Sequence, residues 1–312
     1  MRAPSIIVPT AVMSKDLRLR MRGWRWAGVA TLYVAILASV VIGFLVQKYN
    51  PNDTGPSHVG IEFFQTLAIF ELFLITFVTP ASVAGAISGE RQHRTWDLLV
   101  VSRLSTRQIV WGKLLASIAF NLVLLAASLP LFGLGFLFGG AALSDLVPVF
   151  VVFLFTILLL SSIGLVISAL TARLTVSFMV SMLIALALTV GLSVLTLYQQ
   201  SPGQVGILTV GGVAFNSGDT PSPLAPFAQC DPLMAVLSAL PADGGGSLLG
   251  PVSTINHAFG LQWQLPLWGA YCLLSGLISL VLILAASRFA HARLGFAARP
   301  TRVPWQAVGG RR

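Results

Sequence analysis

Charged residues that could contact another molecule gather in one amphipathic segment. Residues 89–113 read GERQHRTWDLLVVSRLSTRQIVWGK and begin with the neighbouring ions Glu90 and Arg91. Trp96 and Leu99 lie three positions apart, so a helix in this segment would have one apolar face. An ion pair beside an apolar face is suited to binding a protein surface. The simpler alternative is that both ions only cap and solvate a helix end.

The same segment predicts a second short helix. Ser105 followed by Gln108 is the pattern of a capping box, in which each side chain bonds the backbone amide near the other. We therefore expect two short helices with a break near 102–104, the second leading into the next apolar run. A simple helical hairpin needs far fewer residues, so the segment should protrude from the protein and bind a partner.

Glu71 is the other residue that could do chemistry, because it interrupts an apolar run. If a helix begins near Ile61, Glu71 lies about 15 Å along it, at 1.5 Å per residue. A carboxyl group at that depth in a membrane is costly and needs a partner. It could line a transport path or bind a cationic group. The alternative is a structural Glu that is protonated or hydrogen-bonded, for example to Asn121 or to a serine of a neighbouring span.

Motifs for covalent, hydrolytic or metal chemistry are missing from the sequence. The phosphate-binding pattern GxxxxGK[ST] is absent, as are GxSxG and HExxH. The histidines are scattered without metal-ligand spacing, at His58, His93, His257 and His291. We therefore expect no catalytic residues, no metal site and no cofactor in this chain.

The elements that must position these residues are membrane-spanning helices. Only 9% of the 312 residues are charged and 56% are hydrophobic, whereas soluble chains have about 25% charged residues. A helix needs about 20 mostly apolar residues to cross a bilayer. Six segments qualify, at 26–46, 63–88, 114–138, 147–170, 176–197 and 265–287. The expected fold is all-α and polytopic, a single transmembrane domain over 1–312.

The basic residues predict how these spans are oriented. Of the 19 Lys and Arg residues, only Lys48 falls on one side of the six spans, and all the others fall on the opposite side. Because cytoplasmic loops carry the excess of Lys and Arg, both termini and segment 89–113 are expected in the cytoplasm. The net charge of +9 therefore records orientation in a prokaryotic cytoplasmic membrane and does not indicate nucleic-acid binding.

Three segments outside the spans complete this prediction. In the cytoplasmic N-terminus, 1–25, residues 13–24 form an apolar helical stripe flanked by arginines, as in a helix lying on anionic lipid; ordinary flanking charge is the alternative. The long outer loop, 198–264, contains the apolar stretch 226–240. This stretch is either a short helix that rests at, or dips into, the outer membrane face, or part of a lid loop that folds on itself. Residues 288–312 form a cytoplasmic tail.

Segment 89–113 resembles the signature of type-2 ABC exporter permeases, approximately E-R-x-x-G-T-x-x-x-L-L-x-x-P-L-x-x-x-x-I-x-x-G-K. Arg94 and Arg103 stand where the pattern has Gly and Pro. The six-span plan, the basic N-terminus and the long outer loop are also similar. The residues that match are Glu90, Arg91, Thr95, Leu98, Leu99, Leu104, Ile109, Gly112 and Lys113.

The resemblance implies a permease subunit of an ATP-driven exporter, in which 89–113 carries a coupling helix that docks on a separate ABC ATPase subunit. ATP would be bound by that partner, and a second permease subunit, like or unlike this one, would complete the complex. Glu90 and Arg91 would make polar contacts at the ATPase interface, with Thr95, Leu98 and Leu99 in or behind the docking surface.

A polytopic scaffold or a membrane-embedded enzyme that uses no ATP is the alternative function. An enzyme needs polar residues that converge at one depth, and the spans offer only Glu71. A scaffold has no need of a long two-helix loop with this signature. The apolar residues of the spans do not select among substrate classes.

Overall fold

The computed structural model describes residues 24–48, 56–92, 106–138, 142–195, 230–241 and 266–297, and every structural statement below concerns these ranges. The elements found there are all helices. They are α2 (Trp24–Lys48), α3 (Pro56–Val83), α4 (Gly85–Gln92), α6 (Thr106–Leu137), α7 (Leu143–Leu170), α8 (Leu174–Leu186), the π-helical turn η1 (Ala187–Gly191), α11 (Pro232–Ala239) and α12 (Leu267–Ala297).

Six helical stretches are long and apolar enough to cross a membrane, which confirms the expected all-α, six-span fold. Their ranges are Ala27–Gln47, Val59–Gln92, Gln108–Leu137, Ser144–Leu170, Leu174–Leu195 and Leu267–Arg288. Helices are the form that such runs take because hydrocarbon offers no partner for a backbone N–H or C=O. The chain is therefore a multi-pass membrane protein.

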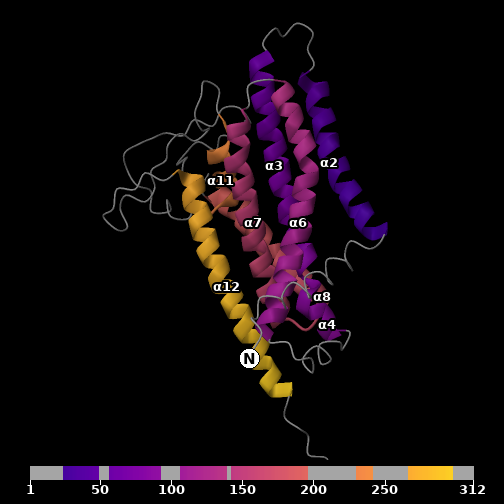
Figure 1. Ribbon diagram of the computed structural model, residues 1–312, viewed down its shortest axis with the longest axis vertical. Coiled ribbons are helices and arrows are strands. Elements are labelled where there is room, and N and C mark those ends of the chain that lie inside the picture. Colours follow the sequence, from indigo (N-terminus) through magenta and orange to yellow (C-terminus); the bar gives the residue numbers. More distant parts are fainter. Residues whose placement is uncertain are drawn as a thin grey trace, which may run out of the picture.

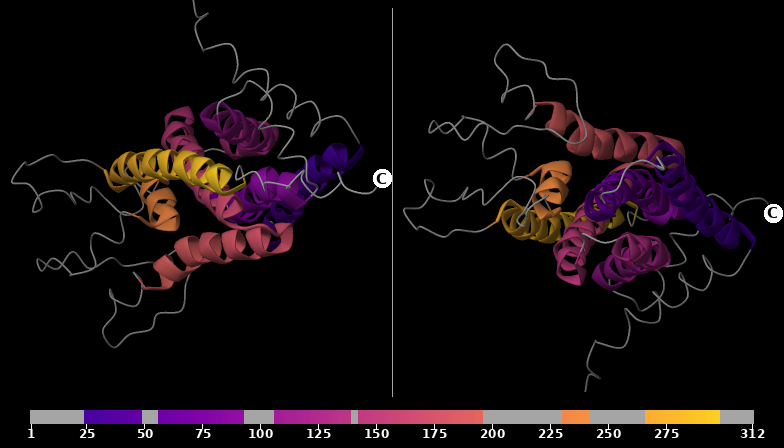
Figure 2. Two further views of the ribbon diagram at one scale, coloured as in Figure 1. Left: turned by 90° about the horizontal axis from the view of Figure 1, so that it is seen from below. Right: turned by 90° about the horizontal axis from the view of Figure 1, so that it is seen from above.

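The bundle is built around α7, which packs on α12, α3, α6 and α8. Viewed along the long axis, α8 and α6 lie on opposite sides of the bundle (Figure 2), and both pack on α3. The outer half of the core is rich in aromatic rings. Phe64 meets Phe132 edge to face with ring centroids 5.5 Å apart, and Phe132 meets Phe150 in the same way at 5.3 Å. This is the arrangement that aromatic rings prefer.

The second span is not one helix, because it breaks at Ala84. Pro80 lies inside α3, and the sequence predicts a bend there, since a proline removes one backbone donor and crowds the preceding turn. The helix continues past Pro80 for another turn, in which the Ala84 amide bonds the Pro80 carbonyl at 2.9 Å. A new helix, α4, then starts at Gly85 and lies at the lower end of the bundle in Figure 1.

Part of the outer stretch 226–240 is the short helix α11. It packs on α12 and α7 and also touches α3 and η1 (Figure 1). Met234, Ala235 and Val236 are buried, and Asp231 caps the helix by accepting a hydrogen bond from the Leu233 amide. Residues 232–239 of this stretch therefore form a helix, and this helix packs among the other helices of the bundle.

Several predicted features lie outside the described residues. These are the interfacial helix before Trp24, the capping residue Ser105, the outer loop apart from 230–241, and the tail after 297.

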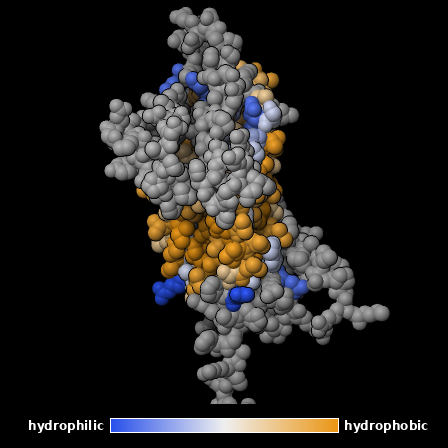
Figure 3. Space-filling model, turned by 90° about the vertical axis from the view of Figure 1, so that its left-hand side faces the viewer, coloured by the Kyte–Doolittle hydropathy of each residue, from blue (hydrophilic) through white to orange (hydrophobic). Residues whose placement is uncertain are grey.

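The outer surface of the bundle is apolar at mid-height. Figure 3 shows a broad hydrophobic band on one face, with hydrophilic residues at its lower edge. Many of the exposed large side chains belong to α2, α8 and α12, among them Leu32, Leu183 and Leu277, each more than 60% exposed. Such a band would be insoluble in water and fits the hydrocarbon of a bilayer.

Candidate functional site

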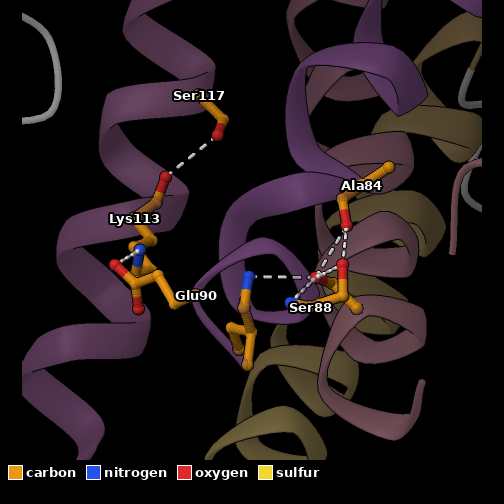
Figure 4. Close-up of polar contacts among 7 residues, drawn as sticks. Ala84, Ser88, Glu90, Lys113 and Ser117 are labelled. Carbon is orange, nitrogen blue, oxygen red and sulfur yellow. Dashed lines mark hydrogen bonds and ion pairs between the residues drawn. The ribbon is translucent and has the colours of Figure 1, made fainter. Parts of the chain in front are cut away.

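Several buried hydrogen bonds gather at the base of segment 89–113, beginning at the break in the second span. The Ala84 carbonyl accepts hydrogen bonds from the hydroxyls of Ser88, Ser168 and Ser177, at 2.6, 2.9 and 2.9 Å. These serines come from α4, α7 and α8, and all three are buried. One carbonyl therefore joins three helices; Figure 4 shows Ala84 and Ser88 at this junction.

Ser168 also satisfies the amides that the break leaves open. The first four N–H groups of a helix have no partner within it, and α4 starts inside the bundle where water is scarce. The amides of Ile87 and Ser88 both donate to Ser168 Oγ, each at 3.0 Å. The hydroxyl thus acts as a helix cap supplied by a different helix.

The C-terminal half of α4 is held by the turn that joins α7 to α8. Arg91 donates to the Ala169 carbonyl at 2.8 Å. Gln92 accepts a hydrogen bond from the Leu174 amide at 3.3 Å. α4 is therefore attached to α7 at both its start and its end, and to the first residue of α8.

Glu90 attaches α4 to a further helix. Lys113 Nζ lies 2.7 Å from Glu90 Oε1, an ion pair between α4 and α6. The Lys113 side chain is 6% exposed and that of Glu90 is 24% exposed, so water screens this pair less than it would a surface pair. The pair joins the two ends of segment 89–113 at the point where it leaves and re-enters the bundle (Figure 4).

We refer to these contacts together as the α4 clamp, defined by Ala84, Ser88, Glu90, Arg91, Gln92, Lys113, Ser168 and Ser177. Two of the predicted site residues, Glu90 and Arg91, are in it, and both contact residues of their own chain. The other three, Thr95, Leu98 and Leu99, lie outside the described residues. The sequence resemblance located Lys113 as the return into the third span, but not as the partner of Glu90.

Ser168 and Ser177 were not anticipated as site residues. Small hydroxyl residues are common in membrane helices and usually bond a carbonyl of their own helix, as Thr156 does here with Val152. Nothing in the sequence marks which serine faces a break in another helix. Only the helix packing shows it.

Glu71, the predicted intramembrane polar residue, is fully buried between three spans. Its Oε1 accepts hydrogen bonds from Tyr33 of α2 at 2.7 Å and from Ser128 of α6 at 2.9 Å. Glu71 Oε2 is buried and has no hydrogen-bond partner among the described residues. A serine of a neighbouring span was one of the expected partners, whereas Tyr33 was not.

Asn121, the other expected partner of Glu71, bonds elsewhere. It accepts from Thr79 at 3.2 Å and donates to Ser82 at 3.1 Å, both on α3. These bonds hold α3 to α6 between Glu71 and the α4 clamp. Polar contacts therefore connect the second and third spans from Glu71 to the Glu90–Lys113 ion pair.

The polar contacts of the α4 clamp, Glu71 and Asn121 hold neighbouring helices together through hydrogen bonds and one ion pair. Within the described ranges, no group of three or more His, Cys, Asp or Glu residues could hold a metal ion. The α4 clamp offers buried hydroxyls, one ion pair, the side chains of Arg91 and Gln92, and backbone groups. Such contacts can fix the direction in which α4 leaves the membrane and transmit a push on it to the neighbouring helices.

The comparison with known families fits this architecture. The sequence profile described as "ABC-2 family transporter protein" matches residues 29–240, which is more than half of the chain and includes the first five spans and the α4 clamp. No curated protein matched the sequence. The profile match, together with the six spans, shows a transporter permease subunit. This chain is a member of the ABC-2 transporter family.

Proposed function

We propose that this permease moves its substrate by coupling to a separate ABC ATPase, which docks on the segment between the second and third spans. The observation that carries the proposal is the α4 clamp. Glu90, Arg91 and Gln92 attach α4 to α6, α7 and α8 immediately before the loop 93–105. A force applied to that loop would be transmitted to three spans at once, as coupling requires.

The docking surface is assigned to the apolar and polar side chains of the loop. Thr95, Leu98 and Leu99 would contact the ATPase, and the apolar pair would supply most of the buried area. Glu90 and Arg91 would act from within the clamp, where both already bind their own chain. In this assignment Leu98 and Leu99 make the main contact with the ATPase, while Glu90 and Arg91 hold α4 in place.

The complex would contain two permease subunits and two ATPase subunits. Symmetric pairs are the commonest assembly among soluble oligomers, and the exposed apolar faces of the spans leave room for both lipid and a second permease. ATP would bind only to the partner ATPase. With 89–113 facing that ATPase, both termini lie in the cytoplasm of a prokaryotic cell, and α11 lies at the outer end.

Co-purification tests this proposal. The full chain, carrying an affinity tag and expressed with a candidate ATPase that contains GxxxxGK[ST], should retain that ATPase in detergent or nanodiscs. Leu98→Trp adds bulk at the docking surface and should reduce the retained ATPase by about ten-fold, since every 1.4 kcal/mol is a factor of ten. Leu183→Trp adds the same bulk to an exposed position of α8 and serves as the matched control.

Two outcomes would contradict the proposal. One is a stable assembly that transports its substrate with no ATPase bound. The other is equal retention of the ATPase by the Leu98→Trp and wild-type chains, which would place docking elsewhere.

A further inference from the structure

The break in the second span is built around the hydroxyl of Ser168, which has no sequence signature. This group donates to the Ala84 carbonyl at 2.9 Å and accepts from the Ile87 and Ser88 amides, each at 3.0 Å. A serine hydroxyl has one hydrogen to donate and two lone pairs to accept with. All three are used at the junction of α3 and α4.

The approach of α7 to this junction is unusually close because Gly164 lies one turn before Ser168. A Cβ at position 164 would lie 3.2 Å from Cβ of Val83, the last residue of α3. Residues four apart occupy the same face of a helix, so Gly164 and Ser168 face α3 together. The absence of a side chain at Gly164 lets the end of α3 pack closely on α7, and Ser168, one turn later, hydrogen-bonds the backbone at the break.

Ser177 makes the corresponding contact from α8. Its hydroxyl donates to the same Ala84 carbonyl at 2.9 Å. Beside it, a Cβ at position 85 would lie 3.2 Å from Leu174 Cδ1, so Gly85 lets the start of α4 pack closely on α8. The fourth and fifth spans therefore both hold the point at which α4 changes direction.

We propose that Ser168 is the positioning residue that sets the direction of α4 and carries its movement to the fourth and fifth spans, a role that rests on the proposed coupling to an ATPase. Two helices can tilt about a break only if the backbone amides and carbonyls that lack a partner within their own helix stay hydrogen-bonded during the tilt. Ser168 supplies partners to both sides of this break, the α3 carbonyl and the α4 amides, so the two pieces can tilt without losing contact with α7.

Loss of the Ser168 hydroxyl should weaken the transmission of movement between helices and leave their apolar packing in place. Replacing Ser168 with Ala keeps the apolar contacts of α7 but removes the only side-chain partner that the structure shows for the Ile87 and Ser88 amides. α4 then loses its fixed direction relative to α7. Docking of the ATPase on loop 93–105 should persist, while the response of the fifth span to ATP should weaken.

The experiment uses the complex of the full chain with its ATPase in nanodiscs. Leu195, at the outer end of the fifth span, is 41% exposed and can be replaced with Cys for bimane labelling in a Cys230→Ala/Cys272→Ala background. The wild-type complex should show a change in bimane emission on addition of ATP and vanadate. Ser168→Ala should reduce this change about five-fold or more, the low end of ordinary coupling free energies, with the amount of bound ATPase unchanged.

Ser161→Ala is the matched control. Ser161 is also a buried serine of α7, two turns earlier, and its hydroxyl has no hydrogen-bond partner among the described residues. Its replacement removes the same atom without touching the break, and the emission change should remain. Ser168→Thr retains a hydroxyl and should restore the change in part.

The possible outcomes separate the two proposals. If no ATPase binds the wild-type chain, the proposed function fails first. If the ATPase binds and Ser168→Ala keeps the full emission change, the role of Ser168 is wrong. Should Ser168→Ala not fold, Ser177→Ala removes the contact of α8 with the Ala84 carbonyl while Ser168 stays in place. The response of the fifth span should weaken in that variant, and an unchanged response would overturn the transmission to the fifth span that the inference requires.

Discussion

Lys113 Nζ lies 2.7 Å from Glu90 Oε1, so one ion pair joins the end of the second span to the start of the third. The two ends of segment 89–113 are therefore joined to each other, one on α4 and the other on α6.

Substitutions of Glu90 and Lys113 should show how much their ion pair contributes to the free energy of unfolding. Glu90→Gln and Lys113→Met each leave one partly buried charge without its partner, and each should lower the free energy of unfolding by about 1–3 kcal/mol. The charge-reversed double variant Glu90→Lys/Lys113→Glu should recover part of that loss. Thermal unfolding in detergent measures these losses. A charge-reversed variant no more stable than either single variant would mean that the two side chains do not attract each other.

The Glu71 cluster should depend on hydrogen bonding and not on charge. Glu71→Gln keeps an oxygen that can accept from Tyr33 and Ser128, so folding and transport should be close to wild type. Glu71→Leu leaves the buried Tyr33 hydroxyl without this acceptor, whereas Ser128 can still donate to the Leu125 carbonyl at 2.8 Å. The substitution should therefore cost about 1–3 kcal/mol, the cost of one unsatisfied group. Equal thermal stability of the Glu71→Gln and Glu71→Leu variants would show that hydrogen bonds to residue 71 do not stabilise the fold. Loss of transport in a well-folded Gln variant would instead show a charge role for Glu71.

Gly164 should be intolerant of a single methyl group. Gly164→Ala places a Cβ 3.2 Å from that of Val83, which forces α7 away from α3 and should destabilise by about 1–3 kcal/mol. Gly133→Ala is the control, since a Cβ there meets nothing within 4 Å and alanine favours a helix by about 1 kcal/mol. Thermal unfolding should therefore move in opposite directions for the two variants, and a shift of the same sign would contradict the close approach.

The Cys230 thiol should react slowly at neutral pH. Burial, and then the negative charge of Asp231, raise the pKa of Cys230 above its usual value. Because the thiolate is the nucleophile, alkylation by iodoacetamide in a Cys272→Ala background should keep accelerating at pH values where an ordinary exposed thiol has already levelled off.

The Asp231→Asn variant tests the second of these causes. Asparagine keeps the N-cap of α11 but removes the charge, so the pKa of Cys230 should fall and alkylation at a given pH should become faster. An unchanged pH profile would show that burial alone sets the reactivity of Cys230.

The spans and the family could be predicted from the sequence because both depend on local patterns. An apolar run of about 20 residues in a bilayer forms a helix whatever its neighbours are, and the signature around Glu90 and Lys113 is contiguous in the chain. Glu71 was recognisable for the same reason, since one carboxyl in an apolar run is conspicuous by itself.

The partners of these residues were decided only by the tertiary structure. Tyr33 lies on a different helix from Glu71, and which of many serines would face Ala84 depended on where Gly164 let α7 approach α3. The sequence also did not indicate the junction of α3 and α4 at Ala84, whose carbonyl accepts hydrogen bonds from hydroxyls of two other spans. Hydropathy sets which segments enter the membrane; close packing between helices sets which polar groups meet there.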